Sequence, residues 1–289
     1  MLPIIVSLTP LFAWGISDYT ASRLSAKENP GAINLSFSLG SIVTALILMA
    51  YFGVPEFTVP IVLRHLASVI IVNLAFLVFL KAFSYGFVGI VAVISNAYAL
   101  VTVLGSALFL GVSINERQWV AMTAVLFGIG LLSYVRNPKS HPDSHKLLMS
   151  ILLSLLAMVG FGLGFMMFDI AATQEWHANF IVMQSMNLLV GPLILLYFTG
   201  WKKAEAIKAM KSVARHKVIY IGAVIASLGT IGLYGGIELT GNAAIPTVFA
   251  AGGPLVTALL AYYFDKERMS LRKWAGAIVV VAGIIALRV

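Results

Sequence analysis

The chain has 289 residues, of which 60% are hydrophobic and only 10% are charged. A soluble domain carries about 25% charged residues, so this composition excludes a soluble enzyme, and the high hydrophobicity excludes a disordered chain. The sequence has no cysteine, which removes disulfides, thiolate metal sites and cysteine nucleophiles. The net charge of +8 indicates basic cytoplasmic loops of a membrane protein rather than nucleic-acid binding.

Ten apolar segments follow one another along the chain, most of them close to the roughly 20 residues that a helix needs to cross a bilayer. Helices are the expected form, because an open sheet edge in lipid leaves backbone polar groups unpaired. The sequence therefore predicts an all-α integral membrane protein with ten transmembrane helices. The expected spans are Leu2–Ser22, Ala32–Phe52, His65–Phe83, Phe87–Leu110, Trp119–Val135, Leu147–Ala171, Asn179–Phe198, Val218–Leu239, Ala243–Phe264 and Trp274–Leu287.

The basic residues are distributed unequally between the two sets of loops. With the N-terminus inside the cell, the cytoplasmic side would carry only Arg64, Arg117 and Arg288, whereas 16 Lys and Arg residues would lie outside. Cytoplasmic loops normally hold the excess of Lys and Arg. We therefore predict both termini outside, with the loops after spans 1, 3, 5, 7 and 9 in the cytoplasm.

The polar segment Trp201–Lys217 has an amphipathic pattern. Its apolar residues recur at helical spacing, and basic residues fill the other face. One interpretation is a helix that binds anionic lipid or regulates the protein. The other, which we favour, is a basic connector that fixes the topology. The apolar positions are Ala204, Ile207, Met210, Val213 and Ala214.

The chain contains an internal repeat. Residues 81–134 align without a gap with residues 236–289, a shift of 155, and 14 of the 54 positions are identical. The matches include Trp119 with Trp274 and Gly128 with Gly283. A repeat of five spans inserts its second copy upside down, and such inverted repeats recur in secondary transporters. We therefore expect two five-helix halves, residues 1–140 and 141–289.

Several motifs in this repeat resemble a known family. The first span has Trp14 and Gly15, and Pro30 precedes the second span. The end of the second half shows a proline, an acidic loop residue, a tryptophan and spaced glycines. The chain thereby resembles the drug/metabolite transporter superfamily, and within it the ten-helix proteins with two EamA-type domains. These motif positions are Pro254, Glu267, Ser270, Trp274, Gly276 and Gly283.

The first half departs from this pattern. Ala99 stands where Pro254 aligns and Val112 where Glu267 aligns, while Glu116 lies only three residues before Trp119. The resemblance implies a secondary carrier of small metabolites, often an exporter of amino acids or related compounds, driven by a proton or counter-substrate gradient. The motifs are mostly structural, so they do not identify the substrate.

Few ionisable residues lie inside the expected spans, where each costs about 2.5–3.5 kcal/mol at a helix centre and marks a functional candidate. Asp18 in span 1 and Asp169 in span 6 occupy equivalent helices of the two halves. Either carboxylate is a candidate proton carrier or partner for a substrate amine; alternatively, each is hydrated near the interface. Glu238 and Lys81 lie toward helix ends, where long side chains reach water.

Polar residues within spans supply further binding candidates. Because asparagine is unfavourable toward lipid, these side chains should point inward. There they either line a cavity or make helix–helix hydrogen bonds worth about 0.6 kcal/mol on average. Trp14 and Phe161, at equivalent positions, are candidates for apolar walls. The polar candidates are Asn73, Asn96, Tyr98, Gln184, Asn187 and Tyr234.

The run Gly252, Gly253 and Pro254 is expected to kink span 9, because proline removes a backbone donor. An interrupted helix in an inverted repeat indicates the binding site or the hinge. We expect these three residues to act in hinge motion or packing. The GxxxG spacings in 160–164 and 232–236 indicate close helix approach.

The sequence has no pattern that indicates ATP hydrolysis, cofactor chemistry or nucleic-acid binding. There is no Walker loop, so direct ATP drive is not expected. No metal or other cofactor is expected, and the basic loops lack the interleaved aromatics of nucleic-acid binding. We predict a multi-pass protein of a prokaryotic inner membrane, for which a monomer suffices and a dimer is possible. The alternative to a transporter is a non-transporting membrane protein, either an intramembrane enzyme or an assembly partner.

Overall fold

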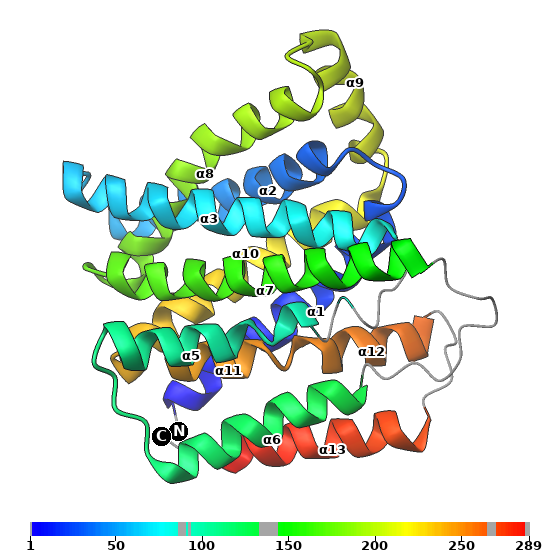
Figure 1. Cartoon of the computed structure of the whole chain (residues 1–289). Coiled ribbons are helices and arrows are strands. Elements are labelled where there is room, and N and C mark those ends of the chain that lie inside the picture. The colour runs from blue at the N-terminus through cyan, green and yellow to red at the C-terminus, as the bar shows by residue number, and fades with distance from the viewer. Residues whose placement is uncertain (1, 86–90, 92–93, 133–143, 265–269, 287–289) are drawn as a thin grey trace.

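The computed structural model describes residues 2–85, 91, 94–132, 144–264 and 270–286, and every regular element in these ranges is a helix. The helices are numbered as in Figure 1. They are α1 (Leu2–Ser25), α2 (Pro30–Phe52), α3 (Val59–Ser84), α5 (Tyr98–Phe109), α6 (Glu116–Leu132), α7 (Ser144–Ala171), α8 (Trp176–Phe198), α9 (Lys203–Ala214), α10 (Lys217–Thr240), α11 (Ala244–Ala250), α12 (Gly253–Phe264) and α13 (Leu271–Ala286).

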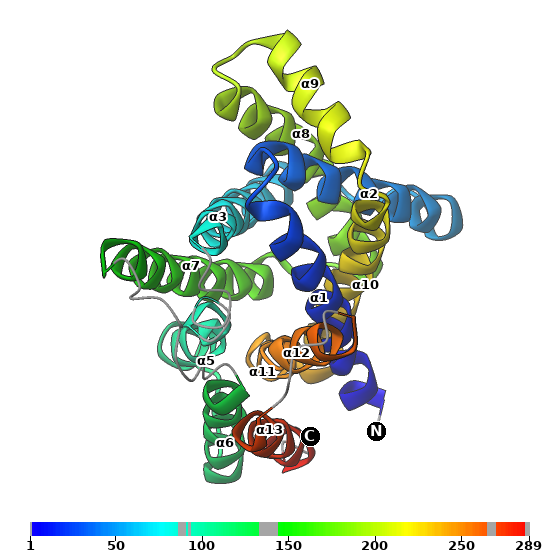
Figure 2. The ribbon, with the colours of Figure 1, turned by 90° about the vertical axis from the view of Figure 1, so that its right-hand side faces the viewer.

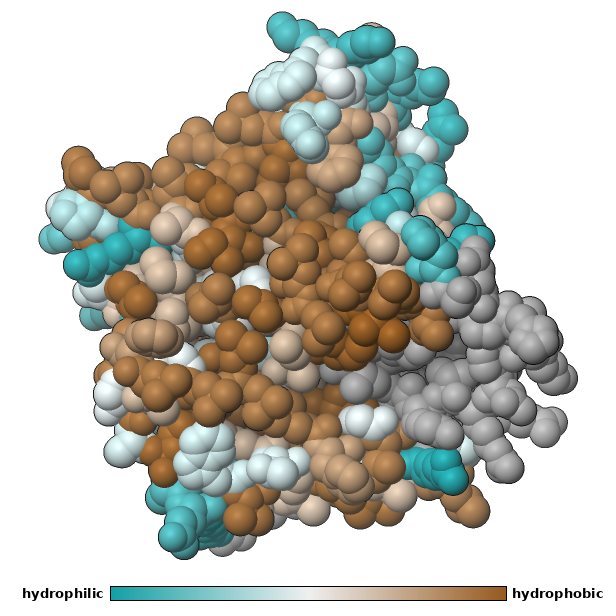
Figure 3. All heavy atoms as spheres, viewed as in Figure 1, coloured by the Kyte–Doolittle hydropathy of each residue, from teal (hydrophilic) through white to brown (hydrophobic). Residues whose placement is uncertain are grey.

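The surface of the bundle is that of a membrane protein. Brown, apolar side chains form a broad band across the middle of the molecule, and hydrophilic side chains gather at its two ends (Figure 3). Among the described helices, seven stretches are long and apolar enough to cross a membrane. Helix α1 begins and α13 ends at the same end of the bundle (Figure 1). The chain is thus an all-helical, multi-pass membrane protein.

The ten expected spans map onto these helices unequally. Seven correspond to α1, α2, α3, α7, α8, α10 and the pair α11–α12. Span 4 is described only in part, and its apolar helix 94–109 is shorter than a full crossing, as is the apolar stretch 274–283 of α13. Helix α6 has 17 residues. The described residues therefore support a many-span bundle without fixing the number at ten.

Helices from the two ends of the chain pack together in pairs. Helix α1 lies against α10, α2 against α8, α3 against α7, and α6 against α13 (Figures 1 and 2). Small residues permit the close approach. Gly160 of α7 faces Ala75 of α3, and Gly232 of α10 faces Thr9 and Pro10 of α1. The glycines of both GxxxG spacings therefore serve helix packing.

Two helices are interrupted at positions 155 residues apart. The chain leaves the helix at Ala251 and Gly252, between α11 and α12, directly before Pro254. A proline is tolerated there because the first turn of a helix needs no donor from it. Ala97, which aligns with Gly252, forms the turn before α5. Both interruptions bring non-helical backbone to the interior of the bundle.

Helix α9 forms where the amphipathic pattern predicts it, but its buried face differs. Ala206 and Val213 are buried against the rest of the bundle, with Met210 partly buried beside them. The side chain of Ile207, expected on that face, is 56% exposed. The reason is that positions 206, 210 and 213 share one side of a 3.6-residue helix, and position 207 is turned about 100° away from 206.

Candidate substrate-binding cavity

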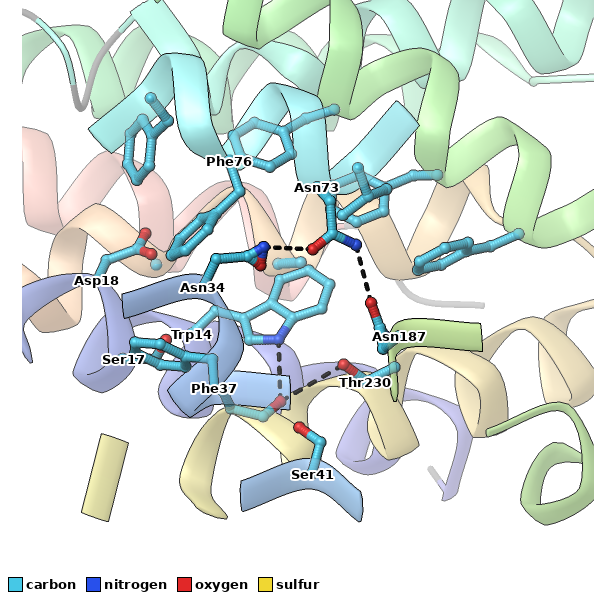
Figure 4. A pocket seen from close by; sticks show the side chains of 18 of the residues that line it. Trp14, Ser17, Asp18, Asn34, Phe37, Ser41, Asn73, Phe76, Asn187 and Thr230 are labelled. Carbon is cyan, nitrogen blue, oxygen red and sulfur yellow. Dashed lines mark hydrogen bonds between the residues drawn. The ribbon is translucent and has the colours of Figure 1, made fainter. Parts of the chain in front are cut away.

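A cavity of about 180 Å³ lies inside the bundle (Figure 4). Its walls come from α1, α2, α3, α7, α8 and α10, together with Ser95, Asn96 and the interrupted stretches at Tyr98 and Gly253. Drug-sized pockets have about 300–1,000 Å³, so this volume suits a small metabolite. The cavity is thus built by helices from both ends of the sequence.

Aromatic side chains form most of the apolar wall. Trp14 stacks on Phe165 with ring centroids 5.2 Å apart, and Phe165 stacks on Phe161 at 6.1 Å. Tyr98 meets Phe165 edge to face. The Trp14 Nε1 donates to the carbonyl oxygen of Ala226 at 3.2 Å, which fixes the indole. The aromatic residues that line the cavity are Trp14, Phe37, Phe76, Phe79, Tyr98, Phe161, Phe165 and Phe168.

A chain of side-chain amides joins α2, α3 and α8 in another wall. Asn34 Nδ2 donates to Asn73 Oδ1, and Asn73 Nδ2 donates to Asn187 Oδ1 at 2.8 Å (Figure 4). Asn187 Nδ2 in turn donates to Gln184 Oε1 at 3.1 Å. All four residues are buried and line the cavity. Burying these amides is tolerable because they satisfy one another.

Asp18 brings a carboxylate to the cavity wall from α1 (Figure 4). Among the described lining residues it is the one acidic side chain, and no Lys, Arg or His lines the cavity with it. Tyr98 lines the same cavity. A carboxylate without a cationic partner in an apolar cavity is costly unless a proton or a ligand neutralises it. The arrangement therefore suits a cation or a proton at this end.

Eight of the residues that the sequence offered as candidates for the site line this one cavity. They come from helices widely separated in the chain, so their meeting depends on the fold. These residues are Trp14, Asp18, Asn73, Asn96, Tyr98, Phe161, Gln184 and Asn187.

The candidates Asp169, Glu238 and Tyr234 do not line the cavity. Asp169 Oδ2 accepts a hydrogen bond from the backbone N–H of Ala243 at 2.9 Å, and Glu238 Oε2 accepts one from Trp176 N at 2.6 Å. Tyr234 is buried and stacks on Phe168, which itself lines the cavity. The two acids thus hold helix ends and loops together at the end of the bundle where α7 and α10 finish.

The run Gly252, Gly253 and Pro254 lies both at a helix interruption and beside the cavity. Gly253 lines the cavity and approaches Gly15 closely, because a Cβ on Gly15 would lie 2.6 Å from the Gly253 carbonyl oxygen. Thr257 Oγ1 donates to Gly15 O at 2.8 Å. Gly252 stands in the interruption, and Pro254 opens the first turn of α12. Helices α1 and α12 therefore meet through nearly bare backbone beside the cavity.

One end of the bundle is held by contacts of α2 and the α2–α3 loop with α8 and the α7–α8 loop. Phe52 stacks on His177 with ring centroids 4.2 Å apart. Glu56 and Gln174 exchange two hydrogen bonds of 3.2 Å, from Glu56 N to Gln174 Oε1 and from Gln174 Nε2 to Glu56 O. These contacts lie at the end where α2 finishes and α8 begins.

The opposite end carries a smaller set of contacts. Glu28, in the α1–α2 loop, accepts a hydrogen bond from Ser212 Oγ at 3.1 Å and lies 2.8 Å from His216 Nε2. Asp18 and Asn34 lie on the portions of α1 and α2 nearer to this loop. The cavity therefore extends toward the end of the bundle that carries the basic α8–α10 connection.

Several cavity residues could not be recognised from the sequence. Asn34 begins an Asn-Leu-Ser triplet, which is a glycosylation signal only in a loop. Asn34 lies inside α2, and nothing in the sequence around it indicated a binding residue. Phe165 and Thr230 sit in apolar helices whose composition resembles every other span. Only the helix pairing identifies which face of each helix points inward. Among the described residues, no group of three His, Asp or Glu side chains is placed to hold a metal.

These features define an integral membrane protein with a small, largely aromatic cavity in its interior that also carries amide side chains and one carboxylate. A model of the EamA-like transporter family matches residues 1–134 and 148–289. The chain therefore belongs to the EamA-like transporter family, as the motifs predicted. Glu267 of those motifs lies outside the described residues.

Two further similarities accompany this match. An uncharacterized protein of Methanocaldococcus jannaschii is 26% identical over 140 residues, which is 48% of this chain and 96% of that protein. A solved crystal structure, described only as that of a protein, is similar with a TM-score of 0.75. It is 13% identical, and the match covers 98% of this chain and 95% of that one. The second similarity concerns the fold alone.

Proposed function

We propose that the protein is a secondary active transporter that exports small organic metabolites, such as amino acids or related compounds, by alternating access. The observation that carries the proposal is the small cavity between helices from both ends of the chain, with the single described acid Asp18 in its wall. A proton or a counter-substrate gradient drives the cycle.

The proposal includes an inverted repeat of two five-helix halves, residues 1–140 and 141–289. In such a repeat α1 corresponds to α7, and α3 corresponds to α10. Exchanging the two halves then turns the packed pair α1–α10 into α7–α3, which is also a packed pair in the structure. The pairs α2–α8 and α6–α13 map onto themselves. The interruptions at Ala97 and Gly252 are related in the same way. The 140-residue match that covers 96% of a relative also supports half the chain as a unit.

In the transport cycle one half rocks against the other and exposes the cavity to each side in turn. The contacts of Phe52 with His177 and of Glu238 with Trp176 close one end. Opening that end breaks them, while the close contact between Gly15 and Gly253 keeps α1 and α12 together beside the cavity.

Asp18 is the proposed coupling residue. Its carboxylate faces the cavity, so a proton and a substrate ammonium compete for the same place. Competition of this kind couples the two fluxes, because the site carries one or the other across. Asp169 and Glu238 belong to the closing contacts in this cycle, since each accepts a backbone hydrogen bond at the opposite end.

The proposed location is a prokaryotic inner membrane with both termini outside. The described basic residues Lys202, Lys203, Lys208, Lys211 and Arg215 lie around α9 at one end of the bundle. The rule that cytoplasmic loops carry the excess positive charge places this end in the cytoplasm. The cavity then faces inward, as an exporter needs for loading.

The test is flux through purified protein in liposomes. The liposomes are loaded with amino acids, amines, nucleosides or sugars, with and without a pH gradient. The proposal predicts saturable flux of one class that the gradient changes, and loss of the pH dependence in Asp18→Asn. Flux that is equally pH-dependent in Asp18→Asn removes Asp18 from the coupling. Absence of flux for every class from folded protein contradicts the proposal.

A further inference from the structure

The cavity presents hydrogen-bonding groups in a fixed order. Asn73 Nδ2 donates to the Val69 carbonyl at 2.8 Å, so its amide orientation is set by the backbone. Its Oδ1 must then face Asn34 Nδ2, and its second N–H must face Asn187 Oδ1. Since each amide donates to the next, the chain of four has a direction.

The two ends of this amide chain differ in what they offer a ligand. Asn34 Oδ1 is an acceptor and Gln184 Nε2 a donor, and neither has a hydrogen-bond partner among the described residues. The antiparallel pairing of α2 and α8, in which Gly31 meets Leu195, places Gln184 farther from the α1–α2 loop than Asn34. We call the end of the cavity nearer this loop its mouth. The amide chain therefore runs from an acceptor near the mouth to a donor farther from it.

The charged group of the cavity lies at the acceptor end. Thr20 of α1 packs on Gly222 of α10, and Thr9 packs on Gly232, so Asp18 is nearer the α1–α2 loop, and hence the mouth, than Thr230 is. Two basic side chains do not line the cavity: Arg23 lies 4.9 Å over the Tyr19 ring, and Lys81 lies 5.1 Å over the Tyr85 ring. The mouth end thus offers a carboxylate and an amide oxygen and no cation among the lining residues described.

The titratable groups on the neighbouring helices α3 and α10 do not offset the negative charge of Asp18. On α3, His65 Nδ1 is paired with the Ile61 carbonyl at 2.9 Å, and the ring packs toward Tyr234 rather than lining the cavity. On α10, Glu238 is bound to Trp176 N. A ligand carboxylate in the cavity would therefore meet a like charge without compensation, which is strongly unfavourable in an apolar site.

The space between these two ends suits a flat apolar group. Trp14 and Phe165 stack almost parallel, with an interplanar angle of 13°, and Phe161 continues the stack at 10°. Aromatic faces stabilise both flat rings and an adjacent ammonium group. The volume of about 180 Å³ limits the ligand to roughly one ring with a short chain.

We propose that the preferred substrate is a small monoamine. Its ammonium group lies at Asp18 and Asn34, and its short, flat, apolar body packs against the stacked rings of Trp14, Phe165 and Phe161. A neutral hydrogen-bond acceptor of the substrate lies at Gln184. This inference rests on the proposed transport function and narrows its small organic metabolites to amines, in place of the amino acids given there as an example. Compounds that carry a carboxylate beside the ammonium, as α-amino acids do, are disfavoured. Arylalkylamines have the required chemistry.

Three compounds with the same ring test the charge preference. Tyramine carries only the ammonium, tyrosine carries ammonium and carboxylate, and 3-(4-hydroxyphenyl)propanoate carries only the carboxylate. Binding is measured on purified protein in detergent, and flux in liposomes, at one fixed pH. We expect tyramine to bind at least tenfold more tightly than tyrosine, and the propanoate not to bind measurably.

Two variants locate the contacts. Asp18→Asn should weaken tyramine binding at least tenfold, while Glu205→Gln, an exposed acid of α9, should leave it unchanged. Gln184→Leu should weaken tyramine severalfold but leave phenethylamine, which lacks the phenol oxygen, nearly unaffected. Helical content and the melting temperature of each variant establish that it is folded, and the phenethylamine control reports on the Gln184→Leu cavity directly.

The outcomes separate the substrate class from transport itself. Tyrosine binding as tightly as tyramine, or selective flux of anions or sugars, overturns the monoamine inference and leaves a transporter. Equal tyramine affinity in folded Asp18→Asn also overturns it. Tyramine binding without flux of any compound supports the cavity chemistry and contradicts the transport function on which the substrate assignment rests.

Discussion

The side chains of Asn73 and Asn187 meet at 2.8 Å in the wall of the cavity and connect α3 to α8 across 114 residues of sequence. Both amides are buried, and Asn73 makes a second bond to its own helix at the Val69 carbonyl. In a low-dielectric interior, a satisfied amide chain of this kind fixes the relative position of the helices that it joins.

Replacing Asn187 by leucine should destabilise the protein. The substitution leaves one N–H of Asn73 without its partner, and an unpaired buried polar group costs about 1–3 kcal/mol. The melting temperature in detergent should fall and ligand binding should weaken. Leu189→Ala on the same helix, where the side chain is 61% exposed, controls for a change in α8 itself. Equal melting temperatures for Asn187→Leu and the wild type would contradict this role.

The close approach of α1 and α12 at Gly15 should be sensitive to a single methyl group. A Cβ at Gly15 would lie 2.6 Å from the Gly253 oxygen and 2.7 Å from Val256 Cβ. Overpacking of this kind costs about 1–3 kcal/mol, so Gly15→Ala should lower the melting temperature and slow transport.

Gly130 offers the matched control for that substitution. It lies in α6, its backbone is helical, and a methyl group added to its Cα would have no neighbouring atom within 4 Å. Gly130→Ala should therefore raise stability by about 0.5–1 kcal/mol, because alanine loses less backbone entropy than glycine. Thermal unfolding in detergent compares the two, and a fall of the same size in both variants would show that the Gly15 contact is not special.

The sequence predicted the class of fold and part of the site. The length and composition of the apolar runs sufficed to predict the long helices, and most of the binding candidates line the cavity. Asp169 and Glu238 were not separable from Asp18 by sequence, because their hydrogen bonds to Ala243 and Trp176 depend on loops. Asn34 was missed because a buried amide is recognised by its partner, which lies 39 residues away.

The ring of Phe52 should control access from the end where α2 meets α8. Phe52→Ala removes the contact with His177 and leaves the Glu56–Gln174 hydrogen bonds. In a protein without native cysteine, a single cysteine at cavity position Ser41 reports access through its rate of labelling. The rate from that end should rise severalfold in Phe52→Ala. Phe57→Ala, at an exposed residue of the following α2–α3 loop, should not change the labelling rate. A rise in both variants would argue against a specific gate.

The membrane orientation is tested by a C-terminal reporter that is active only in the cytoplasm. The excess of Lys and Arg in the loops at the end that carries α9 predicts that both termini lie outside, so this reporter should be inactive. A reporter in the α8–α9 connection at Gly200, a left-handed turn position that faces open space, should be active. The reverse pattern would overturn the proposed orientation.

Alternating access is tested most directly by labelling Ser41→Cys in liposomes with an impermeant thiol reagent added to either side. Ser41 lines the cavity, and Ser106→Cys, buried away from it, serves as the unlabelled control. Alternating access predicts labelling from the α9 side at rest, and labelling from the opposite side only when substrate and a gradient drive turnover. Simultaneous access from both sides at rest, or no access from the opposite side during measured flux, would contradict it.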